Sequence, residues 1–288
     1  MISGYLLEHG TQNKGLGNQM FRMAAVCATA WNNNDLPAFK YTSEQELYID
    51  NIFKKAPFYR VVYDFINGTP VDLDGMPSEW PHGPTYEESF TYTPITYHHQ
   101  MYLKGYFQSP KYWKNQEDRI RDLFYPSTFD QTRLTVGIDS FDKHRGRIGA
   151  LHVRRADYLV SREEHTQLTM NYYNESMNYL ANEVDHWIIC SDDIEWCKEN
   201  FGHMTNVTFS TNTGDSPDDM WLMALCDHFI IANSTYSWWS AWLCKNPNKI
   251  VIYPVEWFGP ALRDTHSIND LIPEGWVGIK ETTWKKKD

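Results

Sequence analysis

Short apolar runs alternate with helical patterns throughout the second half of the sequence. The runs predict five buried strands, at residues 147–153, 186–190, 207–210, 228–232 and 249–253. Between them, apolar residues at helical spacing and helix start signals predict helices at residues 171–184, 194–201, 218–226 and 236–244. Strands separated by crossover segments imply a parallel sheet with helices on both faces, which is an α/β fold.

The first half is less regular. Its patterns predict a strand at residues 4–8, a helix at 18–31, a strand within 95–107 and a helix at 116–124. Residues 64–100 are rich in Pro, Gly, Thr and Tyr and are expected to form loops. A length of 288 residues suits two domains, and a polar stretch at residues 126–146 separates the halves. We therefore expect domains at residues 1–145 and 146–288.

Charge and composition exclude several classes of protein. The net charge of −11 argues against a protein that coats nucleic acid, although a local basic pocket for an anion is compatible with it. The five cysteines have no C-x-x-C spacing, so neither a zinc site nor a disulfide framework is expected. We find no signal-peptide pattern and no transmembrane run, and so expect a soluble, cytoplasmic protein that could touch a membrane only peripherally.

Polar residues follow the predicted strands where ligands of open parallel sheets bind. His152, Arg154 and Arg155 end the first strand, and two guanidinium groups suit phosphate. An Arg–Asp ion pair within a loop explains the same residues equally well. Asp192 follows the second strand, where its carboxylate could accept a hydrogen bond from a ribose or a base.

A third polar cluster precedes the last predicted helix. It consists of Asn233, Ser234, Thr235, Tyr236 and Ser237. Hydroxyl and N–H groups at a helix start favour an anion, although a simple N-cap is the alternative for Ser234 or Thr235. Three such clusters along one sheet predict a crevice for a nucleoside diphosphate.

Two further segments bear on ligands. Residues 15–19 (GLGNQ) form a glycine turn before a helix, where the backbone at Gly17 could approach an anion; a plain helix cap is the alternative. The turn lacks the lysine of a P-loop and the third glycine of a dinucleotide fingerprint. Asp72 and Asp74 form a D-x-D pattern far in sequence from the phosphate clusters, and His98–His99 has no ligand partners at useful spacing. We expect no metal site.

Four segments together resemble the α-1,2-fucosyltransferases of glycosyltransferase family 11. They are residues 15–21 (GLGNQMF), 104–109 (KGYFQS), 152–158 (HVRRADY) and 233–239 (NSTYSWW). Weaker matches in the same order lie at residues 168–173, 191–196, 227–228 and 254–258. Nearly the whole chain takes part in the resemblance.

The resemblance implies a GT-B architecture, in which two Rossmann-like domains face each other across a cleft. It implies that the N-terminal domain serves the acceptor and that the C-terminal domain binds the donor, GDP-β-L-fucose. The implied reaction is an inverting, metal-independent transfer of fucose to the 2-hydroxyl of a terminal β-galactose, without a further cofactor. Within the matched motifs, Arg154 is expected to contact the donor diphosphate and Asn18 to lie near the reacting sugar.

A transfer of this kind leaves charge on GDP, and Arg154 is expected to stabilise it, assisted by Arg155 and the helix start at residues 234–237. Asp157 is the carboxylate best placed in the sequence to act as general base, but it could equally hold Arg155 or the acceptor. His152 is expected to position phosphate or nucleotide rather than to transfer protons.

The sequence departs from the family pattern at two places. Ala156 stands where the family usually has Gly, and Arg22–Met23 replaces a commoner Gln–Tyr, which would alter acceptor choice. Two alternatives stay open: a fucosyltransferase of another linkage (α-1,6 or protein O-linked), and a non-catalytic sugar-binding protein.

Overall fold

The computed structural model describes residues 2–4, 15–40, 52–55, 58–59, 62–63, 70–71, 84–87, 90–127, 131, 146–211 and 216–281. The chain divides into two compact units. The first contains Met1–Tyr125 and Ile268–Leu271, and the second contains Pro126–Ser267 and Ile272–Asp288. The expected boundary after residue 145 falls among residues that are mostly outside the described ranges, and it stays a prediction.

The first unit is built on a parallel sheet in the order β3-β2-β1-β7-β6. Its strands are β1 (Ile2–Gly4), β2 (Pro37–Lys40), β3 (Phe58–Tyr59), β6 (Pro84–Tyr86) and β7 (Met101–Lys104). A separate antiparallel pair is formed by β4 (Val62–Tyr63) and β5 (Pro70–Val71). The helices are α1 (Leu16–Asn32), the 3-10 helix η3 (Pro110–Trp113) and α3 (Glu117–Phe124).

Helix α1 begins at the glycine turn and confirms the helix expected at residues 18–31. It is buried over almost its whole length, and the Phe21 ring lies 5.6 Å from that of Trp113 in η3. The strand expected at residues 4–8 shares only Gly4 with β1, since residues 5–14 lie outside the described ranges. The glycine turn at Gly15 and Gly17 therefore leads directly into a buried helix.

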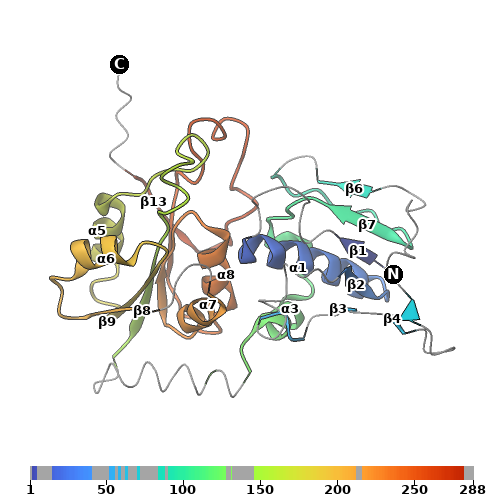
Figure 1. The fold of residues 1–288 in the computed structure, drawn as a ribbon, viewed down its shortest axis with the longest axis horizontal. Helices are drawn as coiled ribbons and strands as arrows, with labels where there is room; N and C mark the ends of the chain where they lie inside the picture. The colour runs from blue at the N-terminus through green and yellow to red at the C-terminus, as the bar shows by residue number, and fades with distance from the viewer. Residues whose placement is uncertain are drawn as a thin grey trace. The chain divides into compact units, whose positions relative to one another are not determined.

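The second unit is built on a parallel sheet in the order β10-β9-β8-β11-β12-β13. Its strands are β8 (Ile148–Val153), β9 (His186–Ser191), β10 (Val207–Phe209), β11 (His228–Ile230), β12 (Val251–Pro254) and β13 (Val277–Ile279). Its helices are α5 (Met170–Tyr179), α6 (Ile194–Phe201), α7 (Pro217–Ala224) and α8 (Thr235–Leu243). Figure 1 shows α5 and α6 on one face of this sheet and α7 and α8 on the other.

The four helices α5, α6, α7 and α8 of the described part of the second unit each begin with a side-chain cap. Thr169, Asp193, Ser216 and Ser234 each accept a hydrogen bond from a backbone N–H in the first turn. Such caps satisfy donors that have no partner within the helix, each contributing about 1 kcal/mol. The starts of these helices are therefore determined locally.

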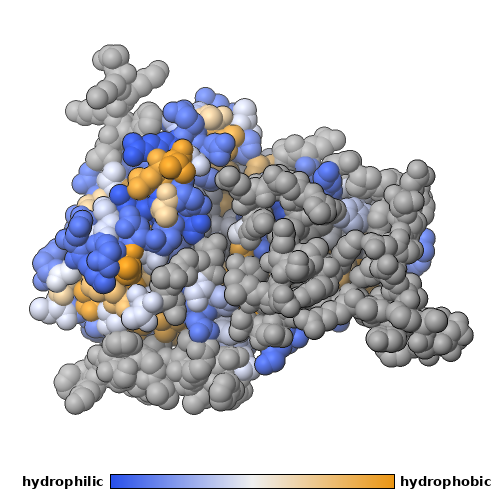
Figure 2. Space-filling view, in the orientation of Figure 1, coloured by the Kyte–Doolittle hydropathy of each residue, from blue (hydrophilic) through white to orange (hydrophobic). Residues whose placement is uncertain are grey.

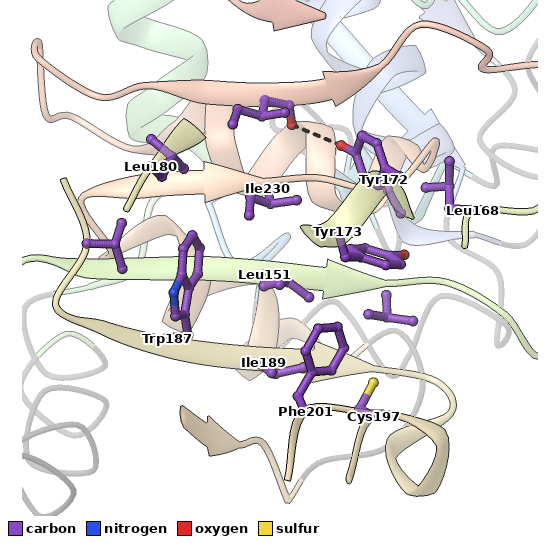
Figure 3. Close-up of a cluster of buried hydrophobic side chains, with 14 residues drawn as sticks. Leu151, Leu168, Tyr172, Tyr173, Leu180, Trp187, Ile189, Cys197, Phe201 and Ile230 are labelled. Carbon is purple, nitrogen blue, oxygen red and sulfur yellow. Dashed lines mark hydrogen bonds between the residues drawn. The ribbon is translucent and has the colours of Figure 1, made fainter. Parts of the chain in front are cut away.

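Alternation along β8 assigns its side chains to the two faces of the sheet. Leu151 and Val153 join a buried cluster with Ile189 of β9 and with residues of α5 and α6, among them Tyr172 and Phe201 (Figure 3). His152 points to the other face, where its ring lies 5.3 Å from that of Tyr236 in α8. Because side chains alternate along a strand, the core and the candidate site lie on adjacent residues.

The five strands predicted for the second half are all present, but the sheet has a sixth, β13, which the sequence analysis missed. Its only signal is the three-residue run VGI, too short for a periodicity argument. The helix expected at residues 171–184 ends at Tyr179. Leu180 and Val184 are still buried in the cluster, and they reach it from a turn rather than from a helix.

The described surface of the face drawn in Figure 2 is largely hydrophilic, with separate hydrophobic areas. In the described part of the chain, the exposed large hydrophobic residues are Leu36, Val160, Tyr179 and Val255. None of the described helices combines the length and the hydropathy that a membrane crossing requires. The cytoplasmic location expected from the sequence stays a prediction. All five cysteines are buried free thiols.

Candidate anion site at the carboxyl edge of the second sheet

The strand order of the second sheet reverses at β8. From β8 the chain continues to β9 and β10 on one side, and it then returns to β11, β12 and β13 on the other side. Ligands of open parallel sheets bind outside the carboxyl ends of the strands at such a reversal. Arg154 directly follows β8, and Ser234 follows β11 at the start of α8. The fold therefore places the segments that begin at Arg154 and Ser234 at the same edge of the sheet, after the neighbouring strands β8 and β11.

Arg154 is held by two carboxylates. Its Nε lies 2.8 Å from Oδ1 of Asp157 and its Nη2 lies 2.9 Å from Oδ2, which makes a bidentate pair. The same Nε lies 3.1 Å from Oδ2 of Asp192. Partial burial of Asp157 opposes the effect, but the Arg154 fork lowers the pKa of this carboxyl below its usual value. A guanidinium fork that binds carboxylate in this way also suits phosphate.

Asp192 organises the loop that carries Arg154. Strands β8 and β9 pair in register, with Val153 opposite Ser191, so Asp192 emerges beside residues 154–156. Its Oδ1 accepts from the Arg155 N–H at 2.8 Å, and its Oδ2 accepts from the Ala156 N–H at 3.2 Å. Burial raises the pKa of Asp192, while Arg154 and the two amides favour its charged form. Both carboxylate oxygens are thus engaged within the protein. The contact with ribose or base expected for Asp192 stays a prediction.

We expect Asp192→Ala to weaken GDP binding by roughly tenfold. The substitution removes the buried partner of Arg154 and two contacts to backbone amides, and each broken contact of this kind costs about 1–3 kcal/mol. Calorimetric titration with GDP measures the effect. Asp264→Ala, an exposed position of the same unit, is the control and should bind like the wild type. Wild-type affinity in Asp192→Ala would show that the loop does not depend on this carboxylate.

Arg155 points away from these groups. Its Nε lies 3.2 Å from Oδ2 of Asp193, and its guanidinium lies 4.3 Å from the centre of the Trp196 ring. The carboxylate that contacts Arg155 is therefore Asp193 and not Asp157. A donor-binding role for Arg155 stays a prediction.

His152 is a buried, neutral imidazole. Burial, together with the nearby charge of Arg154, lowers its pKa to about 3. Its Nδ1 is buried without a hydrogen-bond partner among the described residues. A neutral ring adds no charge to an anion site, so any electrostatic attraction there would come from Arg154. The expected role of His152 in positioning phosphate or nucleotide stays a prediction.

The start of α8 uses most of its side chains within the fold. Ser234 accepts from the Tyr236 N–H at 3.3 Å and so acts as the N-cap. The Tyr236 hydroxyl donates to the Ser216 carbonyl at 2.5 Å, and the fully buried Ser237 hydroxyl lies 3.4 Å from the Ala232 carbonyl and 3.3 Å from that of Ser234. Thr235 is half-buried at the first helical position. Three of these hydroxyl groups are therefore engaged within the fold, which leaves mainly the backbone N–H groups and the helix dipole to attract an anion. The donor-binding roles expected for residues 234–237 stay predictions.

Tyr158 lies at the same edge but was not among the expected site residues, and it contacts Asn233 of the third polar cluster. The Tyr158 hydroxyl donates to the Asn233 carbonyl at 2.9 Å, and the Asn233 amide donates to the carbonyls of Thr166 and Trp257 at 3.1 and 2.8 Å. Asn233 Oδ1 is buried without a hydrogen-bond partner among the residues that the structure describes. These contacts join three loops that follow β8, β11 and β12. Tyr158 and Asn233 both stand in the segments that carry the family resemblance, so the sequence already pointed to this part of the chain.

In the first unit, Gly17 and Asn18 lie in the first turn of α1. The Asn18 Oδ1 accepts from the Gln108 Nε2 at 2.9 Å, which joins the first motif to the motif at residues 104–109. Sequence reasoning missed Gln108, although it stands in that second motif. The roles expected for Gly17 and Asn18 stay predictions.

Arg22 supports the same motif from inside the unit. It is 2% exposed, its Nε donates to the Gly105 carbonyl at 3.0 Å, and its guanidinium lies 4.7 Å from the centre of the Tyr106 ring. The carboxylate of Glu87 accepts from the N–H groups of Tyr106 and Phe107 at 2.8 and 2.5 Å. Arg22 thus supports a turn, and its expected influence on acceptor choice stays a prediction.

The backbone at Ala156 and the candidate metal ligands bear on two further expectations from the sequence. Ala156 is absent from the described non-glycine residues with positive φ, so alanine fits its backbone there. In the part of the chain that the structure covers, no three His, Cys, Asp or Glu side chains gather as metal ligands. His99 lies 3.4 Å from Asp35, while Asp72 and Asp74 fall outside the described residues.

Comparisons with known proteins place the chain in a family. The model of glycosyl transferase family 11 matches residues 7–280. The chain is 34% identical over 189 residues to an α-1,2-colitosyltransferase of Escherichia coli, a match that covers 62% of each chain. It is 27% identical over 151 residues to the human galactoside α-(1,2)-fucosyltransferase 1, covering 48% of this chain and 40% of that one. The matches therefore span less than two thirds of each relative's length.

Solved structures extend the comparison to the fold. POFUT1 in complex with GDP has a TM-score of 0.51 at 12% identity, covering 88% of this chain and 97% of that one. A variant of Arabidopsis thaliana FUT1 in complex with GDP has a TM-score of 0.50 at 13% identity, covering 88% and 69%. The two parallel α/β units are thus of the GT-B, Rossmann-like type, as expected. The chain belongs to glycosyltransferase family 11.

Proposed function

We propose that the protein is an inverting α-1,2-fucosyltransferase that moves L-fucose from GDP-β-L-fucose to the 2-hydroxyl of a terminal β-galactose in a glycan. The observation that carries the proposal is the position of Arg154, beyond β8 at the reversal of the sheet and beside the start of α8. Membership of family 11 supports the reaction class. The second unit would bind the donor, and the first would serve the acceptor.

Arg154 would act on the leaving group. Transfer breaks the bond between fucose C1 and the phosphate oxygen, and the electron pair stays on GDP. A cation that is already in place stabilises this charge as it develops, which lowers the barrier. The N-terminus of α8 would add the partial positive charge of its backbone N–H groups. His152 would position the nucleotide as a neutral ring.

Inversion requires the acceptor hydroxyl to attack C1 from the opposite face while a base takes its proton. Asp157 is one candidate for that base, and its pairing with Arg154 is the competing role. Asn18 is proposed to act near the reacting sugar, held by Gln108.

Two related activities are second candidates. The bacterial relative is an α-1,2-colitosyltransferase, which favours a test of a donor that carries colitose in place of fucose. A fucosyl linkage other than α-1,2 is the other candidate, because the H-x-R-R-x-D element at residues 152–157 also occurs in α-1,6 enzymes.

The purified protein is tested with GDP-fucose and with GDP-colitose, each with and without a β-galactoside. We expect acceptor-dependent release of GDP with GDP-fucose and an α-1,2 linkage in the product by NMR. Faster release from GDP-colitose would reassign the donor, and another linkage would reassign the product. GDP binding without any release across a panel of β-galactosides would favour a non-catalytic sugar-binding protein.

We further propose that the transfer needs no metal ion, because Arg154 would carry the charge that a divalent cation balances elsewhere. Activity should stay within about twofold of its starting value after dialysis against EDTA, a change too small to signal the loss of a charge-stabilising group. The assay is GDP release before and after chelation. Complete loss that Mn²⁺ or Mg²⁺ restores would contradict this and would direct attention to Asp72 and Asp74.

A further inference from the structure

The two carboxylates that hold Arg154 differ in exposure. The side chain of Asp192 is 8% exposed and that of Arg154 is 17% exposed, whereas that of Asp157 is 56% exposed. Asp192 is also fixed by two backbone amides. Asp157 instead directs both of its oxygens to the Arg154 fork from the solvent side. Asp192 is therefore fixed within the fold, whereas Asp157 is an exposed carboxylate that occupies the two N–H donors of Arg154.

The Asp157 carboxylate binds the Arg154 guanidinium at the place where a phosphate group would bind it. The guanidinium presents two parallel N–H donors, and a carboxylate and a phosphate bind such a fork in the same bidentate manner. An exposed ion pair contributes little stability, because water screens it and the side chains lose freedom in forming it. A diphosphate that carries more charge can therefore replace Asp157 at small cost.

We propose that Asp157 occupies the phosphate-binding fork of Arg154 in the ligand-free protein, and that the diphosphate of the donor displaces it while Asp192 stays in place. This inference rests on the proposed function, since it assigns a nucleoside diphosphate to Arg154. Asp157 then acts as an internal competitor that keeps Arg154 oriented and its charge balanced until the donor arrives. No covalent bond changes in this exchange.

The proposed exchange predicts the direction in which GDP affinity changes when Asp157 is replaced. When a protein's own side chain occupies a binding group, the apparent affinity for the ligand falls. It falls in proportion to the fraction of molecules in which the group is available. Removing the competitor should therefore tighten GDP binding. A carboxylate that served only to hold the loop would have the opposite effect, because its loss would disorder Arg154.

The test is the affinity of Asp157→Asn for GDP, measured by calorimetry. Asparagine keeps the shape of the side chain and one acceptor oxygen but loses the charge. We expect GDP to bind roughly two- to fivefold more tightly than to the wild type, the range set by the modest strength of an exposed ion pair. Unchanged or weaker binding by a folded Asp157→Asn protein would overturn the proposal.

A matched control separates displacement from a general change in charge. Glu164→Gln removes one negative charge from an exposed position of the same loop, whereas the carboxylate that occupies the Arg154 fork is that of Asp157. It should change GDP affinity by less than twofold, and equal tightening in both variants would overturn the proposal. Thermal unfolding confirms that each variant is folded.

The wild-type titration distinguishes the two levels of inference. If the wild-type protein does not bind GDP, the proposed function fails. If it binds GDP and Asp157→Asn does not bind more tightly, the displacement alone fails. Asp157→Glu, which retains the charge, should bind no more tightly than the wild type.

Discussion

Arg154→Lys should lower kcat by roughly 10²–10³ with a much smaller change in the KM for GDP-fucose, because the loss concerns a donor that acts on charge developing in the transition state. Lysine keeps the positive charge but cannot present two parallel N–H donors. In the structure, this fork geometry is used in full, since Nε and Nη2 bind separate oxygens of Asp157. We expect the effect on KM to be small because, in the proposed function, the start of α8 shares the ground-state binding of the donor.

Arg155→Lys is the matched control, one residue away on the same loop. Its guanidinium stacks on Trp196 and pairs with Asp193, so the substitution should lower kcat by less than about tenfold. Steady-state kinetics of both variants, purified side by side, decide the matter. A nearly normal kcat for Arg154→Lys, or a greater loss for Arg155→Lys, would move the phosphate role to Arg155.

Phe201→Ala should destabilise the second unit by about 3–5 kcal/mol, the usual cost of emptying a buried aromatic site. Phe201 is 1% exposed at the end of α6, and its ring lies 6.0 Å from that of Tyr173; Figure 3 shows both rings. The Phe201 ring also lies 6.1 Å from that of Trp196. Helices α5 and α6 cover the sheet face opposite His152. A cavity at Phe201 would therefore remove packing contacts that hold these helices against β8 and β9. Urea unfolding followed by circular dichroism measures the change.

Tyr179→Ala is the control for this prediction. Tyr179 is 56% exposed at the end of α5, so its truncation should change the free energy of unfolding by no more than about 0.5 kcal/mol. A loss for Phe201→Ala as small as that for Tyr179→Ala would show that the cluster does not stabilise the unit as its burial suggests.

The sequence was informative wherever a structural feature depends on residues close together in the chain. Strand and helix periodicity repeats within a few residues, so β8, β9, β11, α6 and α8 could be located with errors of one or two positions. The cap Ser234 acts within the first turn of its own helix, and for the same reason the sequence analysis could offer it as an N-cap. Elements without a repeating pattern, such as β13, could not be found in this way.

The sequence by itself determined the α/β class, the parallel second sheet and the placement of Arg154 and Ser234 at strand ends. It could not determine which carboxylate pairs with which arginine. Asp157 lies three residues from Arg154, but Asp192 comes from another strand and reaches the same guanidinium only because β8 and β9 pair in register. Likewise, Arg22 stabilises a turn only because the fold places it against Gly105, which lies 83 residues further along the chain. Ion pairs and hydrogen bonds depend on distances of a few ångströms, and for residues far apart in the chain only tertiary packing sets those distances.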